Sequence, residues 1–150
     1  MIYSATFSIE RFYRHAPEKV FRAFADPEAK AKWFAGPKGQ WKELTREVDF
    51  RVGGQERVRG VHKTGFESFF DCRYHQIVEN RRIVYVYDMH VNKQLISVSI
   101  ATLEMEPKDG GTRFLLTEQG AYLEGGEAAY QSRKEGTEGL MRQLEAALDR

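Results

Sequence analysis

The stretch from Glu127 to Arg150 has its apolar residues at the spacing of an α-helix. The recurring positions, three, four or seven residues apart, are Tyr130, Thr137, Met141, Leu144 and Leu148, with Leu140 and Ala147 beside them. Such spacing places a mostly apolar stripe along one helical face. Most of the chain before this stretch predicts β-strand, and a sheet with one apolar face needs a covering layer. We therefore expect the helix to close a curved sheet and to leave a pocket between them.

The beginning of the chain predicts one strand and two short helices. Residues 2–14 alternate between polar and apolar side chains, as a strand does. Pro17 suits the first turn of a helix, and Phe21 and Phe24 follow at helical spacing. Asp26 is a suitable N-cap for a second helix from Glu28 to Phe34, which ends at a loop rich in glycine and proline.

Six further strands are predicted before the last helix. They run from Glu47 to Val52, Gln55 to His62, Phe66 to Val78, Arg82 to His90, Gln94 to Met105 and Thr112 to Gln119. Polar or glycine-containing segments separate them, and the Gly53-Gly54 pair suits a tight hairpin turn because glycine tolerates positive φ. The expected class is α+β, with a seven-stranded antiparallel sheet.

The fifth of these six strands has apolar residues on both of its faces. One face carries Ile96, Val98 and Ile100, whereas Leu103 lies on the other. A β-bulge near Ala101 would turn both sets toward the core. The alternative is an outward apolar face that becomes buried in a dimer. We favour the bulge.

Composition narrows the class of protein without naming a function. At 150 residues the chain is expected to form one domain, residues 1–150, with a substantial core. It has 23 Lys and Arg against 22 Asp and Glu, so no overall charge draws it to nucleic acid or to an anionic membrane. Arg51, Arg57, Arg59 and Lys63 cluster on the first predicted hairpin, where basic residues also prevent edge pairing. No recognition motif accompanies them, so no nucleic-acid partner is predicted.

The sequence carries no sign of export or of membrane insertion. Cys72 is the one cysteine, which rules out an internal disulfide and suits a reducing compartment. The N-terminal residues lack the basic and then apolar order of a signal peptide. The longest apolar run, Ile83 to Tyr87, is far too short for a membrane span. We predict a cytoplasmic protein without a membrane span.

Four short motifs, together with the order of the elements, resemble one known family. The motifs are APEKVFRAF with DPE at 16–28, WF with GP at 33–37, DFRVGG at 49–54, and EP with GGTR at 106–113. They are similar to the START-like, or SRPBCC, superfamily, and within it to the branch named for the activator of the Hsp90 ATPase. The resemblance implies a helix-grip fold, in which a seven-stranded curved antiparallel sheet wraps around a long C-terminal helix and two short helices follow the first strand.

Three positions depart from the pattern of that family. Ala35 lengthens the WF-GP motif by one residue, which shifts a loop at the mouth of the expected pocket. Cys72 stands where the family often has glycine. Thr137 follows Gly136 where the family usually has tryptophan. The last change is expected to enlarge or polarise the pocket where the helix crosses the sheet.

Two carboxylates are predicted to face the interior. Strand alternation places Glu56 on the same face as Val58, and Glu118 on the same face as Phe114 and Leu116. Burial would raise the pKa of such a carboxyl group, a property that catalytic acids and bases share. Three explanations stay open: the carboxylates are wetted or paired with arginine, they orient a ligand, or they catalyse proton transfer.

Other residues give no sign of metal or cofactor chemistry. His15, His62, His75 and His90 lie on separate elements, and no pair has the spacing of metal ligands. Cys72 is interpreted as an inert core thiol. No phosphate-binding glycine loop or nucleophile motif is present. We predict no metal, no cofactor and no catalytic residue.

Two glycines inside the last predicted helix need an explanation. Gly136 and Gly139 each cost roughly 1 kcal/mol relative to alanine. We expect either that the sheet or a bound molecule approaches the helix backbone closely at these positions, or that the helix bends there; packing against the sheet is preferred.

The preferred hypothesis is that the chain binds a small hydrophobic or amphipathic molecule of unknown identity between the sheet and the last helix. The candidate residues are predicted to face this space or to lie at its mouth: Trp33, Phe34, Glu56, Val58, Phe70, Tyr74, Phe114, Leu116, Glu118, Tyr130, Thr137 and Met141. One alternative is an enzyme similar to a polyketide cyclase or a hydrolase. The other is an interaction module similar to the chaperone-ATPase activator. The chain is expected to be a monomer or a homodimer.

Overall fold

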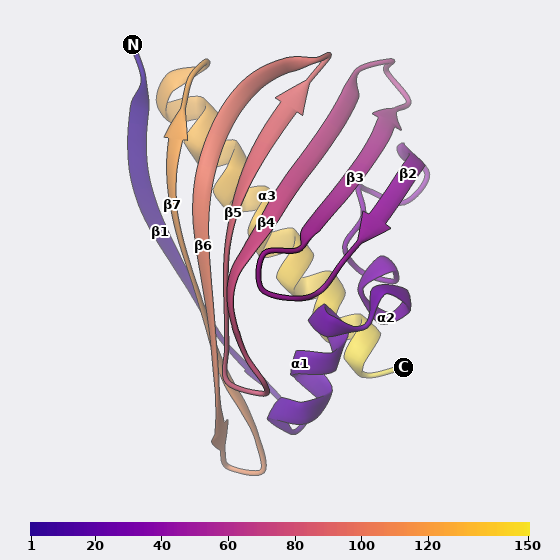
Figure 1. Ribbon diagram of the computed structural model, residues 1–150, viewed down its shortest axis with the longest axis vertical. Helices are drawn as coiled ribbons and strands as arrows, with labels where there is room; N and C mark the ends of the chain where they lie inside the picture. Colours follow the sequence, from indigo (N-terminus) through magenta and orange to yellow (C-terminus); the bar gives the residue numbers. More distant parts are fainter.

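Seven antiparallel strands form one curved sheet in a computed structural model that describes residues 1–150. The strands are β1 (Tyr3–Tyr13), β2 (Trp41–Val48), β3 (Gln55–His62), β4 (Glu67–Val78), β5 (Arg82–Val91), β6 (Gln94–Lys108) and β7 (Gly111–Tyr122). Their order across the sheet is β1-β7-β6-β5-β4-β3-β2 (Figure 1). Hairpins therefore join β2 to β7 in succession, and β1 completes the sheet by pairing with β7. The predicted α+β fold is confirmed.

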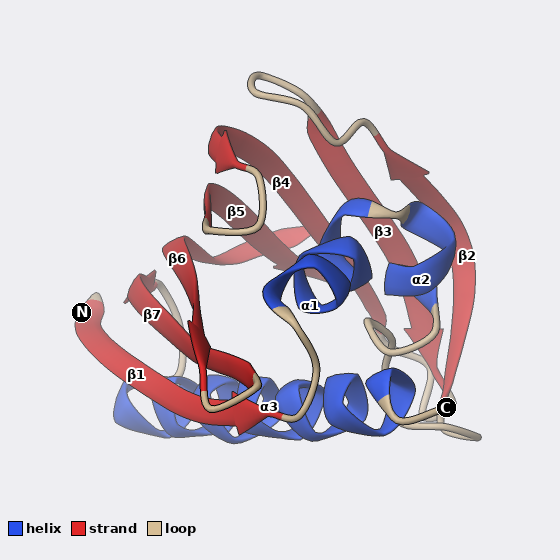
Figure 2. Cartoon of the chain, turned by 90° about the horizontal axis from the view of Figure 1, so that it is seen from below, coloured by secondary structure: helices blue, strands red, loops and turns tan.

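Three helices cover the concave side of the sheet. They are α1 (Pro17–Ala25), α2 (Pro27–Ala31) and α3 (Gly126–Leu148). The sheet arches over α3, and α1 and α2 lie inside the same arch (Figure 2). The side chain of Asp26 accepts a 3.1 Å hydrogen bond from the backbone nitrogen of Glu28, so the predicted N-cap of α2 is present.

The end of α3 is attached to the beginning of α1. The Nζ atom of Lys19 donates a 2.7 Å hydrogen bond to the carbonyl of Leu148, one of the last carbonyls of α3 that lack a partner within the helix. The Tyr13 hydroxyl on β1 donates a 3.2 Å hydrogen bond to the Met141 carbonyl. These bonds hold the helix against the N-terminal part of the chain.

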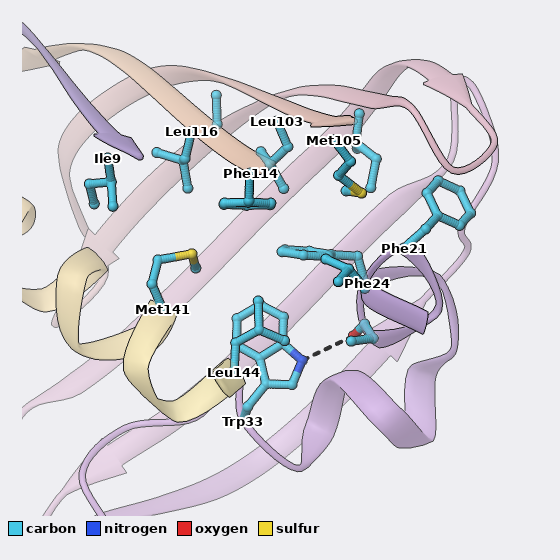
Figure 3. Close-up of a cluster of buried hydrophobic side chains, with 14 of the residues drawn as sticks. Ile9, Phe21, Phe24, Trp33, Leu103, Met105, Phe114, Leu116, Met141 and Leu144 are labelled. Carbon is cyan, nitrogen blue, oxygen red and sulfur yellow. Dashed lines mark hydrogen bonds between the residues drawn. The ribbon is translucent and has the colours of Figure 1, made fainter. Parts of the chain in front are cut away.

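A packed hydrophobic core lies where α1 and α3 meet β1 and β7. Phe24 stacks on Phe114 with the ring centres 5.8 Å apart, and Met141 and Leu144 point to the same region from α3 (Figure 3). The indole nitrogen of Trp33 donates a 3.0 Å hydrogen bond to the Ala23 carbonyl, which satisfies the one polar atom of this buried ring. The part of the expected pocket next to β1 and β7 is therefore filled by side chains.

Several predicted boundaries are wrong, and those of α2 and β2 differ most from the structure. Helix α2 ends at Ala31 rather than at Phe34, and β2 runs from Trp41 to Val48 rather than from Glu47 to Val52. The earlier start of β2 has a packing reason, because the Trp41 ring lies directly over Gly60 of β3. A polar segment with few apolar residues thus forms a strand, since one aromatic side chain anchors it to its neighbour.

The bulge predicted near Ala101 is also wrong. From Ser97 to Lys108, β6 pairs with β7 without any register shift. The inward residues next to Arg133 and Glu118 are small and polar, so the aliphatic residues of this segment face outward instead. Val98 is 36% exposed and Ile100 is 43% exposed on the convex face. Burial of this face in a dimer stays a prediction.

The glycines of α3 do not mark a close approach. A Cβ atom added to Gly136 would meet nothing within 4 Å, and one added to Gly139 would meet only the end of the Arg142 side chain at 3.7 Å. The expectation that the sheet packs tightly against these glycines is therefore wrong. Their cost in helix propensity is not offset by packing within the chain.

Replacing Gly136 by alanine is expected to stabilise the protein. The free energy of unfolding should rise by roughly 1 kcal/mol, because alanine is the better helix former and its methyl group meets open space. For a chain of this size the melting temperature should rise by about 2–4 °C. Urea denaturation followed by circular dichroism measures the change. Gly60→Ala is the matched control and should destabilise, because its methyl group would overlap the Trp41 ring; a loss of stability in Gly136→Ala would contradict the open environment.

Candidate functional site

Two buried polar clusters lie on the concave face of the sheet. Glu56 on β3 belongs to the first and Glu118 on β7 to the second, and both side chains point inward as strand alternation indicates. Each carboxylate is matched by one cation from a helix. The two clusters lie on opposite sides of the inner faces of β4 and β5.

In the first cluster, Lys30 of α2 forms an ion pair with Glu56. The Nζ atom is 2.6 Å from Oε1 of Glu56, and the two side chains are 3% and 0% exposed. The Tyr74 hydroxyl on β4 donates to the same oxygen and lies 3.4 Å from Nζ of Lys30. Oε2 of Glu56 is buried and has no hydrogen-bond partner. The cluster ties a short helix to two strands and leaves one acceptor unsatisfied.

Aromatic rings surround the ammonium group of Lys30. Its Nζ atom lies 4.5 Å from the ring centre of Phe34 and about 6 Å from those of Tyr74 and Tyr85. Ring faces attract cations, and they do so more strongly where water is absent. The rings thus compensate part of the desolvation of this charge.

Burial sets the acidity of the neighbouring groups. Burial raises the pKa of Tyr74 far above its usual range, and the charge of Glu56 raises it further, so the phenol stays protonated. Burial also raises the pKa of the Cys72 thiol to about 12. Cys72 is thus an unreactive core thiol at neutral pH, in agreement with its interpretation from the sequence.

In the second cluster, Arg133 of α3 reaches the inner face of the sheet. Its guanidinium donates to the Tyr87 hydroxyl at 3.0 Å and to Oγ of Ser97 at 2.8 Å. Tyr87 in turn donates to Oε2 of Glu118 at 2.8 Å, and Nη1 of Arg133 lies 3.9 Å from that oxygen. Burial raises the pKa of Glu118, while the charge of Arg133 and the hydrogen bond from Tyr87 oppose the rise.

Partly buried apolar residues lie between and around the two clusters. They come from the loop after α2, from β2, from β5 and from α3: Phe34, Trp41, Tyr85, Met89 and Leu140. The Tyr85 ring is about 6 Å from those of Tyr74 and Tyr87, so it links the clusters. Its hydroxyl makes no hydrogen bond within the chain, and burial raises its pKa well above the usual value.

Two surface hollows lie away from this region. One, of about 210 Å³, is lined by Arg59, Glu67, Phe69, His90 and Lys93. The other, of about 320 Å³, lies at the turn between β2 and β3 and is lined mainly by charged side chains and backbone. No group of three or more His, Cys, Asp or Glu side chains has an arrangement that could hold a metal ion.

The structure separates the sequence-predicted candidate residues into two groups. Phe34, Glu56, Phe70, Tyr74 and Glu118 belong to the two polar clusters or contact them. The others are packed in the hydrophobic core or at its edge: Trp33, Val58, Phe114, Leu116, Tyr130, Thr137 and Met141. The Thr137 hydroxyl donates to the Arg133 carbonyl one turn earlier at 2.9 Å. The Thr137 hydroxyl therefore has its hydrogen-bond acceptor within the helix and has no donor left for the pocket.

The two cationic side chains of these clusters, Lys30 and Arg133, were not identified from the sequence. Lys30 precedes Trp33 and Phe34 by three and four residues, so it shares their helical face. Arg133 in the same way lies between Tyr130 and Thr137 on the buried stripe of α3. A charged residue at an apolar position of a helical pattern is the signal that could have identified both.

Comparison with known proteins agrees with this fold. The sequence pattern of the family described as "Activator of Hsp90 ATPase homolog 1-like protein" matches residues 14–149. A protein from Rhizobium leguminosarum is 39% identical, with a TM-score of 0.93 over 99% of this chain and 97% of that one. A protein from Rhizobium loti is also 39% identical, with a TM-score of 0.88 over 98% and 99% of the two chains. One from Chromobacterium violaceum is 30% identical, with a TM-score of 0.78 over 97% of each.

No match was found among curated proteins. Of the three helices, none combines the length and the apolar character that crossing a membrane requires.

Removing one member of the buried ion pair should cost more than removing both charges. Lys30→Met leaves the Glu56 carboxylate without its cation and is expected to lower the free energy of unfolding by about 3–5 kcal/mol. The double variant Lys30→Met/Glu56→Gln should recover most of that loss, because no uncompensated charge remains. Chemical denaturation of both variants and the wild type tests this; equal losses would show that the charges do not interact.

Stability should depend on the titration of Glu118 in a defined direction. Because its pKa is raised above 4.5 in the folded protein, the protonated carboxyl favours folding, and this contribution is lost as the pH rises through the folded value. Glu118→Gln cannot titrate. The free energy of unfolding of the wild type, relative to that variant, should therefore fall as the pH rises above 4.5. Urea denaturation at several pH values measures the difference, and a constant difference would contradict the raised pKa.

Proposed function

The chain belongs to the family of Activator of Hsp90 ATPase homolog 1-like proteins, and we propose that it binds a small hydrophobic or amphipathic molecule. The molecule would lie between α3 and the concave face of β3, β4 and β5. This region is lined by aromatic and aliphatic side chains and has polar groups at two ends, which is the usual composition of a small-molecule site.

The observation that carries the proposal is the environment of Tyr85. Its ring lies on the concave face between Tyr74 and Tyr87, and the side chain is only partly buried. Its hydroxyl has no partner in the chain. An occupant of this region would cover the accessible part of the ring and pair with the hydroxyl.

The opposite half of the interior supports the same assignment. Around Phe24, Phe114 and Leu144 the space between helix and sheet is filled (Figure 3). A ligand would therefore lie toward β3, β4 and β5, where Phe34, Met89 and Leu140 are only partly buried. These three residues come from different elements and would form the walls.

The buried carboxylates have a role in this function that requires no chemistry. Glu56 and Glu118 are each paired with a cation and hydrogen-bonded to a tyrosine. Such groups orient a ligand and hold the walls in place. The enzyme alternative needs a reacting group free to exchange a proton with a substrate, and both carboxylates are already engaged.

The family is named for a chaperone-ATPase activator, and a protein with that activity would need a different structural feature. An interaction module requires an exposed binding surface rather than an interior one. The exposed residues Val98 and Ile100 on the convex face belong to such a surface. Pull-down with the chaperone distinguishes this alternative from ligand binding.

The single buried cysteine supports placement of the protein in a reducing compartment such as the cytoplasm.

Fluorescence of a neutral apolar probe tests the proposed function. N-phenyl-1-naphthylamine should bind the wild type with a stoichiometry of about one per chain and with enhanced emission. Leu140→Trp should weaken binding by about tenfold, because the larger side chain occupies the proposed region. Leu44→Trp, at an exposed position on the edge strand β2, is the matched control and should leave the affinity unchanged. Absence of binding by the wild type, or equal affinity in Leu140→Trp, would contradict the proposal.

A further inference from the structure

We propose that the ligand is an uncharged molecule with a hydroxyl group, held between Glu56 and Arg46 at the edge of the Phe34 ring. This inference rests on the proposed function, because it assigns the chemical class of the molecule that the interior binds. It follows from the charge balance of the interior and from two of the five buried side-chain atoms that have no hydrogen-bond partner, Oε2 of Glu56 and Nη1 of Arg46.

Arg46 provides the second unpaired group. It lies on β2 opposite Val58, so it faces the same concave side as Glu56, which lies two residues from Val58 on β3. Its Nε atom donates to Glu43 at 2.7 Å and its Nη2 atom to the Phe34 carbonyl at 2.7 Å. Its Nη1 atom is buried and has no partner. One donor therefore remains unsatisfied on this side chain.

The unpaired donor and the unpaired acceptor are close to one aromatic ring. The Cζ atom of Arg46 lies 6.0 Å from the ring centre of Phe34, and Lys30, which is bonded to Glu56, lies 4.5 Å from the same centre. Diagonal positions on adjacent strands have Cα atoms about 7–8 Å apart, within reach of long side chains. We therefore place a single small group at the edge of the Phe34 ring, where it would bond to both atoms.

The chemistry of the two unpaired groups selects the ligand. Oε2 of Glu56 only accepts hydrogen bonds, so its missing partner is a donor. Nη1 of Arg46 only donates, so its missing partner is an acceptor. A hydroxyl group is both. Each buried unpaired group costs on the order of 1–3 kcal/mol, and a ligand hydroxyl would remove both costs at once.

The charge balance excludes an ionised head group. The buried cations already have carboxylate partners: Lys30 pairs with Glu56, Arg133 lies 3.9 Å from Glu118, and Arg46 pairs with Glu43, which is 42% exposed. A ligand carboxylate would add an uncompensated charge next to Glu56, and a ligand ammonium group would add one next to Lys30 and Arg46. Burial of an unpaired charge is strongly unfavourable, so a neutral hydroxyl compound is preferred over its charged counterparts.

Three probes that share one ring system test the inference by calorimetry. They are 2-naphthol, which is neutral and has a hydroxyl, 2-naphthoate, which is an anion, and naphthalene, which has no polar group. The wild type should bind 2-naphthol about tenfold more tightly than either of the others, because hydrogen bonds to charged groups are the stronger ones.

Variants at the two unpaired groups locate the hydroxyl. Arg46→Met removes the donor, and Lys30→Met/Glu56→Gln removes the charged acceptor without leaving a lone buried charge. Each should reduce the preference for 2-naphthol over naphthalene to a few-fold. Arg59→Met is the matched control, since Arg59 lies on β3 but stacks on Phe69 in the convex-face hollow. It should retain the full preference.

The possible outcomes distinguish failure of this inference from failure of the proposed function. If none of the three probes binds, the proposed function fails and the inference fails with it. If the probes bind with equal affinity, or 2-naphthoate binds best, the inference is overturned while binding in the interior stands. If both variants keep the preference of the wild type, the hydroxyl does not lie between Glu56 and Arg46, and the assignment is wrong. The Arg46→Met variant leaves the buried ion pair intact, so it remains informative if the double variant does not fold.

Discussion

The ion pair between Lys30 and Glu56 is the interaction on which the arrangement of the interior depends. Two charges placed away from water are tolerable only if each compensates the other and further hydrogen bonds complete the shell. Tyr74 and the aromatic rings around Lys30 provide most of that shell, and only Oε2 of Glu56 lacks a partner in it. Because Lys30 belongs to a helix of only five residues, this pair, rather than helix length, fixes α2 against the sheet. The positions of Trp33 and Phe34, which follow α2 directly, are set by the same contact.

The two halves of the interior differ in composition, one being apolar and the other partly polar. Toward β1 and β7, large apolar side chains from three elements interlock, and the helix contributes Met141 and Leu144 to a dry core. Toward β3, β4 and β5, cations from α2 and α3 extend to carboxylates and tyrosines, and several apolar residues stay partly accessible. A core built only for stability would fill this half with aliphatic residues, since burying ion pairs contributes little net free energy. The polar half thus has the composition of a binding site.

Periodicity predicted the elements well because most of them have one buried face. The helical stripe ending at Leu148 and the alternation around Val58 and Phe114 are direct consequences of that burial. The failures have a common cause, which is contact between distant residues. Trp41 begins β2 because Gly60 leaves room for its ring, and the outward Ile100 reflects the polar residues on the other face of β6. The carboxylates were predicted from their own strands, whereas Lys30 and Arg133 meet them only through the tertiary fold.

The pairing of β1 with β7 has a consequence for the synthesis of the chain. Tyr13 pairs with Thr112, and Tyr3 with Tyr122, so β1 has no partner until β7 has also been synthesised. At about 5–20 residues per second this delay is roughly 5–20 s. Helix α3 then follows and covers the finished sheet. Until β7 is available, β1 is an unpaired amphipathic strand and the sheet stays incomplete at that edge. Its alternation of Ser and Thr with Phe7 and Ile9 keeps one of its faces polar throughout that interval.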